Sequence, residues 1–274
     1  MLALVVTVPA GEAELASDML WSLGVLAVEE REPDSGTADH LVELWTSLGN
    51  DVDSVTHAAE GYPKRWRWHL ANVDETVADS WRQHAVATWV ESDLVIAPAW
   101  VPINADRGVT VIRIEPGATF GLGDHPTTVL SLRALRTAMF PGATVLDVGC
   151  GSGVLSVAAC RFGAGRVDAI DISTAAPPVT LANAELNEVG GRITASTTPL
   201  AEVDGQYDVV VANILAPALI DLGNDLRRVV KPGGVLIVSG LLVDNHAHVR
   251  AALAPMQLVG EEQRDGWTAL TLRW

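Results

Sequence analysis

The sequence has little cysteine, few basic residues and no long apolar run. Its two cysteines, Cys150 and Cys160, are too few for a disulfide framework or for a metal site with the usual number of ligands, and we expect both to be reduced. The first basic residue is Arg31, so the apolar opening lacks the charged flank of a signal peptide. Apolar runs such as residues 235–243 are far shorter than a membrane span. We therefore expect a cytoplasmic protein with no membrane partner and no metal.

Positive charge is scarce, most of all in the first third of the chain. Lys and Arg total 18 against 34 Asp and Glu. Residues 1–100 hold 17 acidic and 5 basic residues, a net charge of −12, whereas residues 101–274 hold 17 and 13, a net charge of −4. Direct nucleic-acid binding is disfavoured, because phosphate backbones require a basic surface. The acidic third suits a basic protein partner, or it only aids solubility, and composition leaves both open.

Residues 1–75 have the pattern of a small α+β domain. Alternating apolar residues from Leu2 to Val8 predict a strand that ends at Pro9, and a helical stripe of Ala16, Met19, Leu20 and Leu23 follows. Further strands are expected near 25–29, 41–45 and 65–70, which suggests a ferredoxin-like domain. Residues 76–108 are expected to link this domain to the rest through a helix and a strand. Seven of the nine Trp lie in residues 1–100, either as contact anchors for a partner or as ordinary core residues.

From residue 109 to 274 the pattern becomes an alternation of strands and helices. Such alternation predicts a doubly wound, mainly parallel α/β sheet, and the last two apolar segments look like an antiparallel edge pair. The expected strands cover residues 144–148, 166–170, 193–197, 207–212 and 235–238. One helix is expected to begin at residue 129, and three more are expected over residues 154–162, 179–189 and 219–229.

Three glycines at alternate positions, Gly149, Gly151 and Gly153, directly follow an acidic strand end, Asp147. A second carboxylate, Asp171, closes the next strand, where a ribose would need an acceptor. A dinucleotide fingerprint needs G-x-G-x-x-G, but here the third glycine comes one residue early, and Asp147 would repel a pyrophosphate. S-adenosylmethionine, which is cationic and carries no phosphate, fits both observations. The alternative is a tight turn that only lets the backbone pack closely, although the strand-helix-strand context favours a nucleoside site.

Two further segments carry polar groups toward this site. Residues 116–128 combine three glycines, the aromatic Phe120 and the hydroxyls of Thr127 and Thr128, as expected for a loop that closes over a cofactor. The two threonines could also cap the helix expected from Val129, a role that is compatible with the first, and His125 is left without a role. Asn213 ends a strand, where its amide oxygen could accept a hydrogen bond from a cofactor or from an attacking amine, or simply form a turn.

These motifs resemble a known family, the methyltransferases of large-ribosomal-subunit protein eleven, PrmA. The resemblance rests on F-G-L-G-D-H-P-T-T, V-L-D-V-G-C-G-S-G-V-L-S, A-I-D-I, V-V-V-A-N-I-L-A and K-P-G-G-V-L-I-V-S-G-L-L, and it covers about residues 78–274. It implies a class I, Rossmann-like methyltransferase that uses S-adenosylmethionine, with cofactor contacts at Thr128, Gly149, Asp171 and Asn213. It also implies an N-terminal domain that docks the ribosomal protein and presents lysine and N-terminal amines to one site. Leu122, Asp124 and Ser173 depart from the family pattern.

We therefore expect an S-adenosylmethionine-dependent protein N-methyltransferase with Asn213 as its catalytic residue. One alternative is a methyltransferase of the same fold that acts on another protein or on a small amine. Another is a non-catalytic protein that keeps the cofactor as a structural ligand, and a nicotinamide oxidoreductase is disfavoured by the glycine spacing. The expected cofactor contacts are Thr128, Gly149, Asp171, Asn213, Asp147, Gly151 and Phe120.

Overall fold

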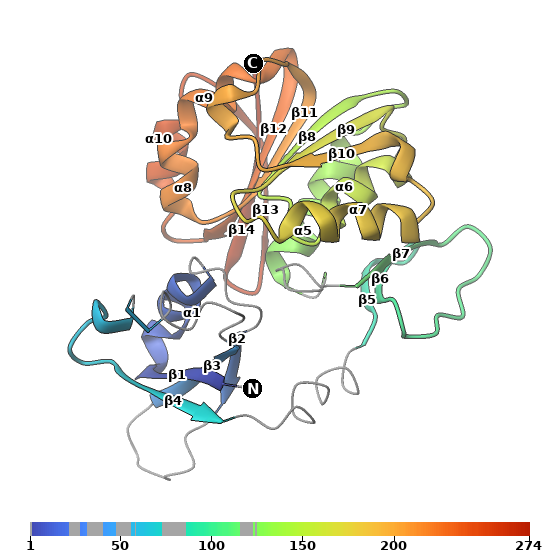
Figure 1. Cartoon of the computed structure of the whole chain (residues 1–274). Coiled ribbons are helices and arrows are strands. Elements are labelled where there is room, and N and C mark those ends of the chain that lie inside the picture. The colour runs from blue at the N-terminus through green and yellow to red at the C-terminus, as the bar shows by residue number, and fades with distance from the viewer. Residues whose placement is uncertain are drawn as a thin grey trace. The chain divides into compact units, whose positions relative to one another are not determined.

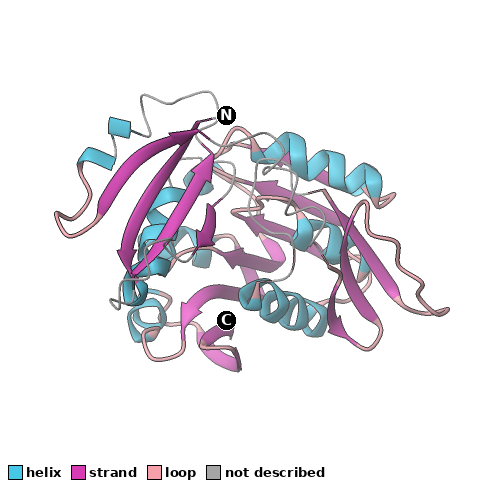
Figure 2. Cartoon of the chain, turned by 90° about the horizontal axis from the view of Figure 1, so that it is seen from below, coloured by secondary structure: helices cyan, strands magenta, loops and turns pink. Residues whose placement is uncertain are grey.

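The computed structural model describes residues 2–21, 28–31, 41–47, 56–57, 59–72, 86–115, 123 and 125–274. The remaining residues are grey in Figures 1 and 2. The chain divides into two compact units, residues 1–85 and 86–274. The linking helix expected after residue 75 lies outside the described residues.

The first unit is built on a four-stranded antiparallel sheet with the order β2-β3-β1-β4. This order is the one expected of a ferredoxin-like domain. Leu4, Val6 and Val8 alternate along β1 and pack with Ala16 and Leu20 of α1, because strands and helices bury one face each. The elements are β1 Leu2–Pro9, the 3-10 helix Ala10–Glu12, α1 Ala13–Trp21, β2 Val28–Arg31, β3 Leu41–Ser47 and β4 Arg67–Asn72.

The second unit contains a seven-stranded sheet with the order β10-β9-β8-β11-β12-β14-β13. The first five strands are parallel, and β14 and β13 add an antiparallel edge pair, as the sequence predicts. A separate sheet contains β5 Thr88–Glu91, β6 Leu94–Pro98 and β7 Thr110–Ile114. The strands of the large sheet are β8 Thr144–Val148, β9 Arg166–Ile170, β10 Ile193–Ser196, β11 Tyr207–Asn213, β12 Val230–Leu242, β13 Gln257–Arg264 and β14 Trp267–Arg273.

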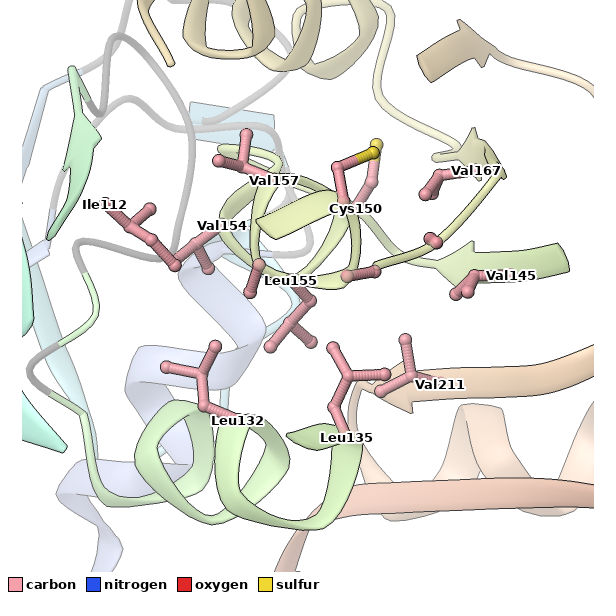
Figure 3. Close-up of a cluster of buried hydrophobic side chains, with 14 of the residues drawn as sticks. Ile112, Leu132, Leu135, Val145, Cys150, Val154, Leu155, Val157, Val167 and Val211 are labelled. Atoms are coloured by element: carbon pink, nitrogen blue, oxygen red, sulfur yellow. The ribbon is translucent and has the colours of Figure 1, made fainter. Parts of the chain in front are cut away.

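Helices cover both faces of this large sheet, so the fold is doubly wound (Figure 1). Consecutive residues of β8 show the alternation: Val145 packs in the cluster that includes α5 and α6, and Leu146 packs in the cluster that includes α8 to α10. Figure 3 shows the first cluster, with Leu132 and Leu135 of α5 facing Leu155 of α6. The helices are α5 Pro126–Ala138, α6 Val154–Arg161, α7 Ala176–Leu186, α8 Ala216–Asp221, α9 Gly223–Arg228 and α10 Ala247–Ala252, with 3-10 turns at Gly190–Arg192 and Leu200–Glu202.

Three details within residues 216–252 differ from the sequence-based expectation. The helix expected over 219–229 is split into α8 and α9, which meet at Gly223, a poor helix former. A Cβ at this glycine would lie 2.9 Å from the carbonyl oxygen of Ala252, so its small size allows close approach to α10. The structure also contains α10 itself, which the sequence did not predict, and β12 extends well beyond residues 235–238.

Candidate functional site

Three neighbouring parallel strands place the candidate residues at one edge of the sheet. β9, β8 and β11 lie side by side, so their carboxyl ends share that edge. The chain order also reverses here, since the strands that follow β8 run outward through β9 and β10 on one side and through β11 and β12 on the other. Such a switch point is where ligands bind in doubly wound sheets. Asp147, Asp171 and Asn213 are all carried by this edge.

The glycine turn after β8 needs its glycines for backbone conformation and for space. Gly149, Gly151 and Gly153 all have positive φ angles, of 77°, 51° and 79°. A Cβ at Gly149 would lie 2.3 Å from Cγ2 of Ile214, and the N–H of Gly149 donates to the carbonyl of Ile170 at 2.8 Å. The close-packing interpretation therefore holds for this turn, and it is compatible with ligand binding at the same turn.

Asp171 is fixed to the glycine turn through its carboxylate. Oδ2 accepts a hydrogen bond from the N–H of Gly151 at 2.9 Å, and Oδ1 accepts one from the N–H of Ser173 at 2.8 Å. The side chain is partly exposed, and each carboxylate oxygen has a further lone pair for a hydroxyl donor. Ile172, the next residue, is 95% exposed and offers an apolar surface that the sequence-based interpretation missed. A hydrophobic residue directly after the strand-end acid was the available signal.

Asp147 lies beneath the turn and is only 1% exposed. Its Oδ2 accepts a hydrogen bond from Ser156 Oγ at 2.6 Å, whereas Oδ1 has no hydrogen-bond partner among the described residues. Burial raises the pKa of this carboxyl to about 7; the Ser156 hydrogen bond opposes the rise, and the negative charge of Asp171 adds to it. A buried acceptor without a partner is costly, so this oxygen suits a donor or a cation supplied by a ligand.

The start of α5 differs from the interpretation in which Thr127 and Thr128 cap a helix that begins at Val129. The helix begins at Pro126, and His125 is its N-cap: the N–H of Thr127 donates to Nδ1 of His125 at 3.3 Å. Proline is favoured in the first turn because its missing N–H would have no partner there, and it keeps the preceding residue extended. The His-Pro pair was therefore the sequence signal for this helix start.

Two buried hydroxyls lie in this first turn of α5. Thr128 is 1% exposed, and its Oγ1 has no hydrogen-bond partner among the residues that the structure describes.

The ring of His125 packs edge-on against Trp267 of β14, with 5.0 Å between the ring centroids. Phe120 lies outside the described residues, as do the other residues of 116–122 and Asp124.

Asn213 ends β11 and is partly exposed. The next residue, Ile214, packs closely against two glycines, Gly149 after β8 and Gly240 near the end of β12, and fills the space that their missing side chains leave. A Cβ at Gly149 would collide with its side chain, and a Cβ at Gly240, whose φ is 86°, would lie 2.5 Å from its carbonyl oxygen. Close packing on both sides of Ile214 therefore fixes the position of Asn213.

Within the described ranges, no group of three or more His, Cys, Asp or Glu residues is arranged to hold a metal ion. None of the helices in those ranges is both long and apolar enough to cross a membrane.

Comparisons with known proteins agree with the motifs. The family model described as "Ribosomal protein L11 methyltransferase (PrmA)" matches residues 2–274. A ribosomal protein L11 methyltransferase of Geobacter sulfurreducens is 38% identical over 291 residues, covering 97% of this chain and 95% of the relative. One from Trichlorobacter lovleyi is 34% identical, covering 92% and 90%. The crystal structure of a ribosomal protein L11 methylase from Lactobacillus delbrueckii subsp. bulgaricus matches with a TM-score of 0.64 and 35% identity, covering 68% of this chain and 97% of that one.

The family model matches nearly the whole sequence. This match adds to the evidence from the glycine turn, the two strand-end acids and the doubly wound sheet. The resemblance found in the motifs is confirmed, and with it the fold class. This chain belongs to the ribosomal protein L11 methyltransferase (PrmA) family.

Proposed function

We propose that this protein is an S-adenosylmethionine-dependent protein N-methyltransferase that modifies lysine and N-terminal amines of a large-subunit ribosomal protein. The relatives are named for ribosomal protein L11, and we take L11 as the substrate. The observation that carries the proposal is the convergence of Asp147, the glycine turn and Asp171 at one strand edge. This edge suits a positively charged nucleoside that carries no phosphate.

The residues at this edge fit the cofactor. Asp171 would accept hydrogen bonds from the ribose hydroxyls, and the exposed side chain of Ile172 would cover one face of the adenine. Asp147 and Thr128 each carry a buried oxygen without a partner in the described chain, and these oxygens would take polar or cationic groups of the cofactor. Gly149 and Gly151 would let the cofactor approach the backbone. When bound, S-adenosylmethionine supplies a methyl group that its sulfonium has already activated.

The acceptor amine must be neutral to react. Removing a proton from an ordinary lysine at pH 7 costs about 4–5 kcal/mol. We assign Asn213 the role of accepting a hydrogen bond from this nitrogen, which would hold it in line for transfer. A desolvated position beside a cation would lower the pKa of the amine. We assign no general base, since the sequence offers no dedicated one.

We further propose that residues 1–75 recognise the ribosomal protein and that residues 109–274 catalyse the methyl transfer. Residues 76–108 would link these two domains. The charge of −12 over residues 1–100 supports this assignment, because ribosomal proteins are basic. Glu30 and Glu60 are exposed acidic residues of the first unit. At least one of the tryptophans there, Trp66, is a core residue rather than a contact anchor. The proposal places the protein in the cytoplasm, with no direct nucleic-acid binding.

The test is transfer of labelled methyl groups to purified ribosomal protein L11, with a small amine as competitor substrate. We expect label on L11 and little on the small amine; the reverse result would favour a small-molecule methyltransferase. Absence of any methylated product, with the cofactor bound, would favour a non-catalytic protein. Glu30→Gln with Glu60→Gln should raise the KM for L11, whereas Glu202→Gln with Glu262→Gln, two exposed acids of the second unit, should not.

A further inference from the structure

Helix α7 presents a buried polar stripe to the rest of its unit. Thr180 and Asn183 of α7 and Asn187, its C-cap residue, are spaced by three and four residues, lie on one face and are 0%, 1% and 6% exposed. Buried polar side chains destabilise a fold unless they are hydrogen-bonded. Their partners therefore show what this face of the helix does.

The first two residues of the stripe hold the glycine turn. Oγ1 of Thr180 lies 3.2 Å from the carbonyl oxygen of Gly151, and Nδ2 of Asn183 donates to the carbonyl oxygen of Ser152 at 2.9 Å. Two successive carbonyls of the turn therefore accept hydrogen bonds from α7. The missing side chain of Gly153 permits this approach, since a Cβ there would lie 2.9 Å from Cα of Thr180.

Asn183 also binds the backbone of Glu115, the residue directly after β7. Its Oδ1 accepts from the N–H of Glu115 at 2.8 Å, and its Nδ2 donates to the carbonyl of Glu115 at 2.8 Å. Asn187 makes the same pair of hydrogen bonds to Arg113, at 2.9 and 2.6 Å. Both amides thus pair with the end of β7 or the residue directly after it, but only Asn183 also bonds to the glycine turn.

Gly151 lies at the centre of this arrangement. Its N–H donates to Asp171, and its carbonyl accepts from Thr180. The position of the Asp171 carboxylate relative to the turn thus depends on a residue whose following peptide group α7 holds through the carbonyl oxygen. Preorganised groups bind a ligand more tightly because less ordering is needed on binding.

We propose that Thr180 and Asn183 are positioning residues of the cofactor site, which act on the cofactor through the Gly151 and Ser152 carbonyls. The proposal rests on the proposed function, because it takes this edge as the binding site for S-adenosylmethionine. It adds that affinity for the methyl donor is set in part by α7, whose side chains lie behind the turn.

Matched variants of the full chain test this proposal. Asn183→Asp and Asn187→Asp keep the side-chain shape, but an ionised carboxylate cannot donate a hydrogen bond. Both variants lose the donor to β7, and only Asn183→Asp loses the donor to the turn. Calorimetric titration with S-adenosylmethionine should give a Kd raised at least tenfold in Asn183→Asp and in Thr180→Val, and raised less than threefold in Asn187→Asp. In turnover, the KM for the donor should rise while kcat at saturating donor stays near that of the wild type.

Equal Kd changes in Asn183→Asp and Asn187→Asp, or an unchanged Kd in Asn183→Asp, would overturn the proposal while leaving the proposed function intact. A wild-type chain that binds no S-adenosylmethionine would refute both. If Asn183→Asp does not fold, hydrogen exchange on the wild type serves instead. Cofactor binding should then slow exchange of the Glu115 amide, which bonds to Asn183, more than that of the Arg113 amide, which bonds to Asn187. Equal slowing at both amides would contradict the proposal.

Discussion

Asp171 accepts a hydrogen bond from the backbone N–H of Gly151 at 2.9 Å, so the carboxylate that follows β9 is fixed to the glycine turn that follows β8. We expect Asp171→Ala to raise the Kd for S-adenosylmethionine by about 100-fold or more, because hydrogen bonds to a charged acceptor contribute about 1.5–3 kcal/mol each. Calorimetry measures this change. Asp168→Ala is the control: Asp168 lies within β9, three residues before Asp171, and its carboxylate accepts hydrogen bonds from Thr194 and Tyr207, so its loss should lower stability and leave Kd unchanged. Unchanged affinity in Asp171→Ala would count against the site.

Gly149 and Gly142 allow a backbone effect to be separated from a collision. Both have positive φ, of 77° and 83°, but a Cβ at Gly142 meets open space, whereas one at Gly149 would collide with Ile214. Gly142→Ala should therefore cost about 1–2 kcal/mol of unfolding free energy, the usual cost of this conformation. Gly149→Ala should cost more and also weaken cofactor binding, because the stiff β-branched Ile214 must move. Denaturant unfolding with parallel binding measurements tests this, and equal costs for the two variants would show that the collision is relieved.

The buried carboxyl of Asp147 predicts a pH dependence of cofactor binding. Its pKa is raised from 3.8 to about 7, mainly by burial. A cation beside it favours the ionised form, so binding should release protons near pH 6–7, and affinity should fall by up to about tenfold per unit as pH drops below 7. Calorimetry in two buffers of different ionisation enthalpy measures the release. Asp147→Asn, which can still accept from Ser156, should show neither effect, and a flat profile in the wild type would contradict the assignment.

The same group predicts how the cofactor-free protein responds to pH. Between about pH 4 and about 7 the folded state keeps the proton and the unfolded state has lost it, so this carboxyl makes the unfolding free energy fall as pH rises through that range. The effect is complete above pH 7. Denaturant unfolding of the wild type and of Asp147→Asn should therefore converge at acidic pH and diverge toward neutral pH, with the variant relatively more stable. Parallel profiles would indicate that Asp147 is ionised in the folded protein.

Asn213 is the residue to which we assign alignment of the acceptor amine. Asn213→Ala should lower kcat by about 100-fold, since small misplacements of reacting groups have effects of this size, and should raise the Kd for the methyl donor by much less. Single-turnover methyl transfer together with calorimetry separates the two quantities. Lost donor affinity with kcat preserved at saturation would make Asn213 a cofactor contact only.

The sequence predicted the strands beneath the site well because each is a short apolar run ended by polar or glycine residues. The expected ranges 144–148 and 166–170 are those of β8 and β9. The strand ends that bring Asp147, Asp171 and Asn213 to one edge follow from the parallel alternation alone. The ferredoxin-like order of the first sheet also agrees with expectation.

The details that were missed depend on contacts between segments far apart in the sequence. Asn183 looks like an ordinary helix residue until its distances to Glu115 and Ser152 are known. The division between α8 and α9 depends on the approach of α10 to Gly223. The His125 cap, by contrast, had a local signal in the His-Pro pair. The role proposed for Phe120 remains a prediction, since it lies outside the described residues.

The most direct test of the account is a crystal structure of the full chain with bound S-adenosylmethionine. The account predicts that the ribose hydroxyls hydrogen-bond to Asp171, that the adenine lies against Ile172, and that the methyl group faces Asn213. Cofactor bound elsewhere on the protein, or a strand edge left empty at saturating cofactor with its side chains filling the space, would contradict it.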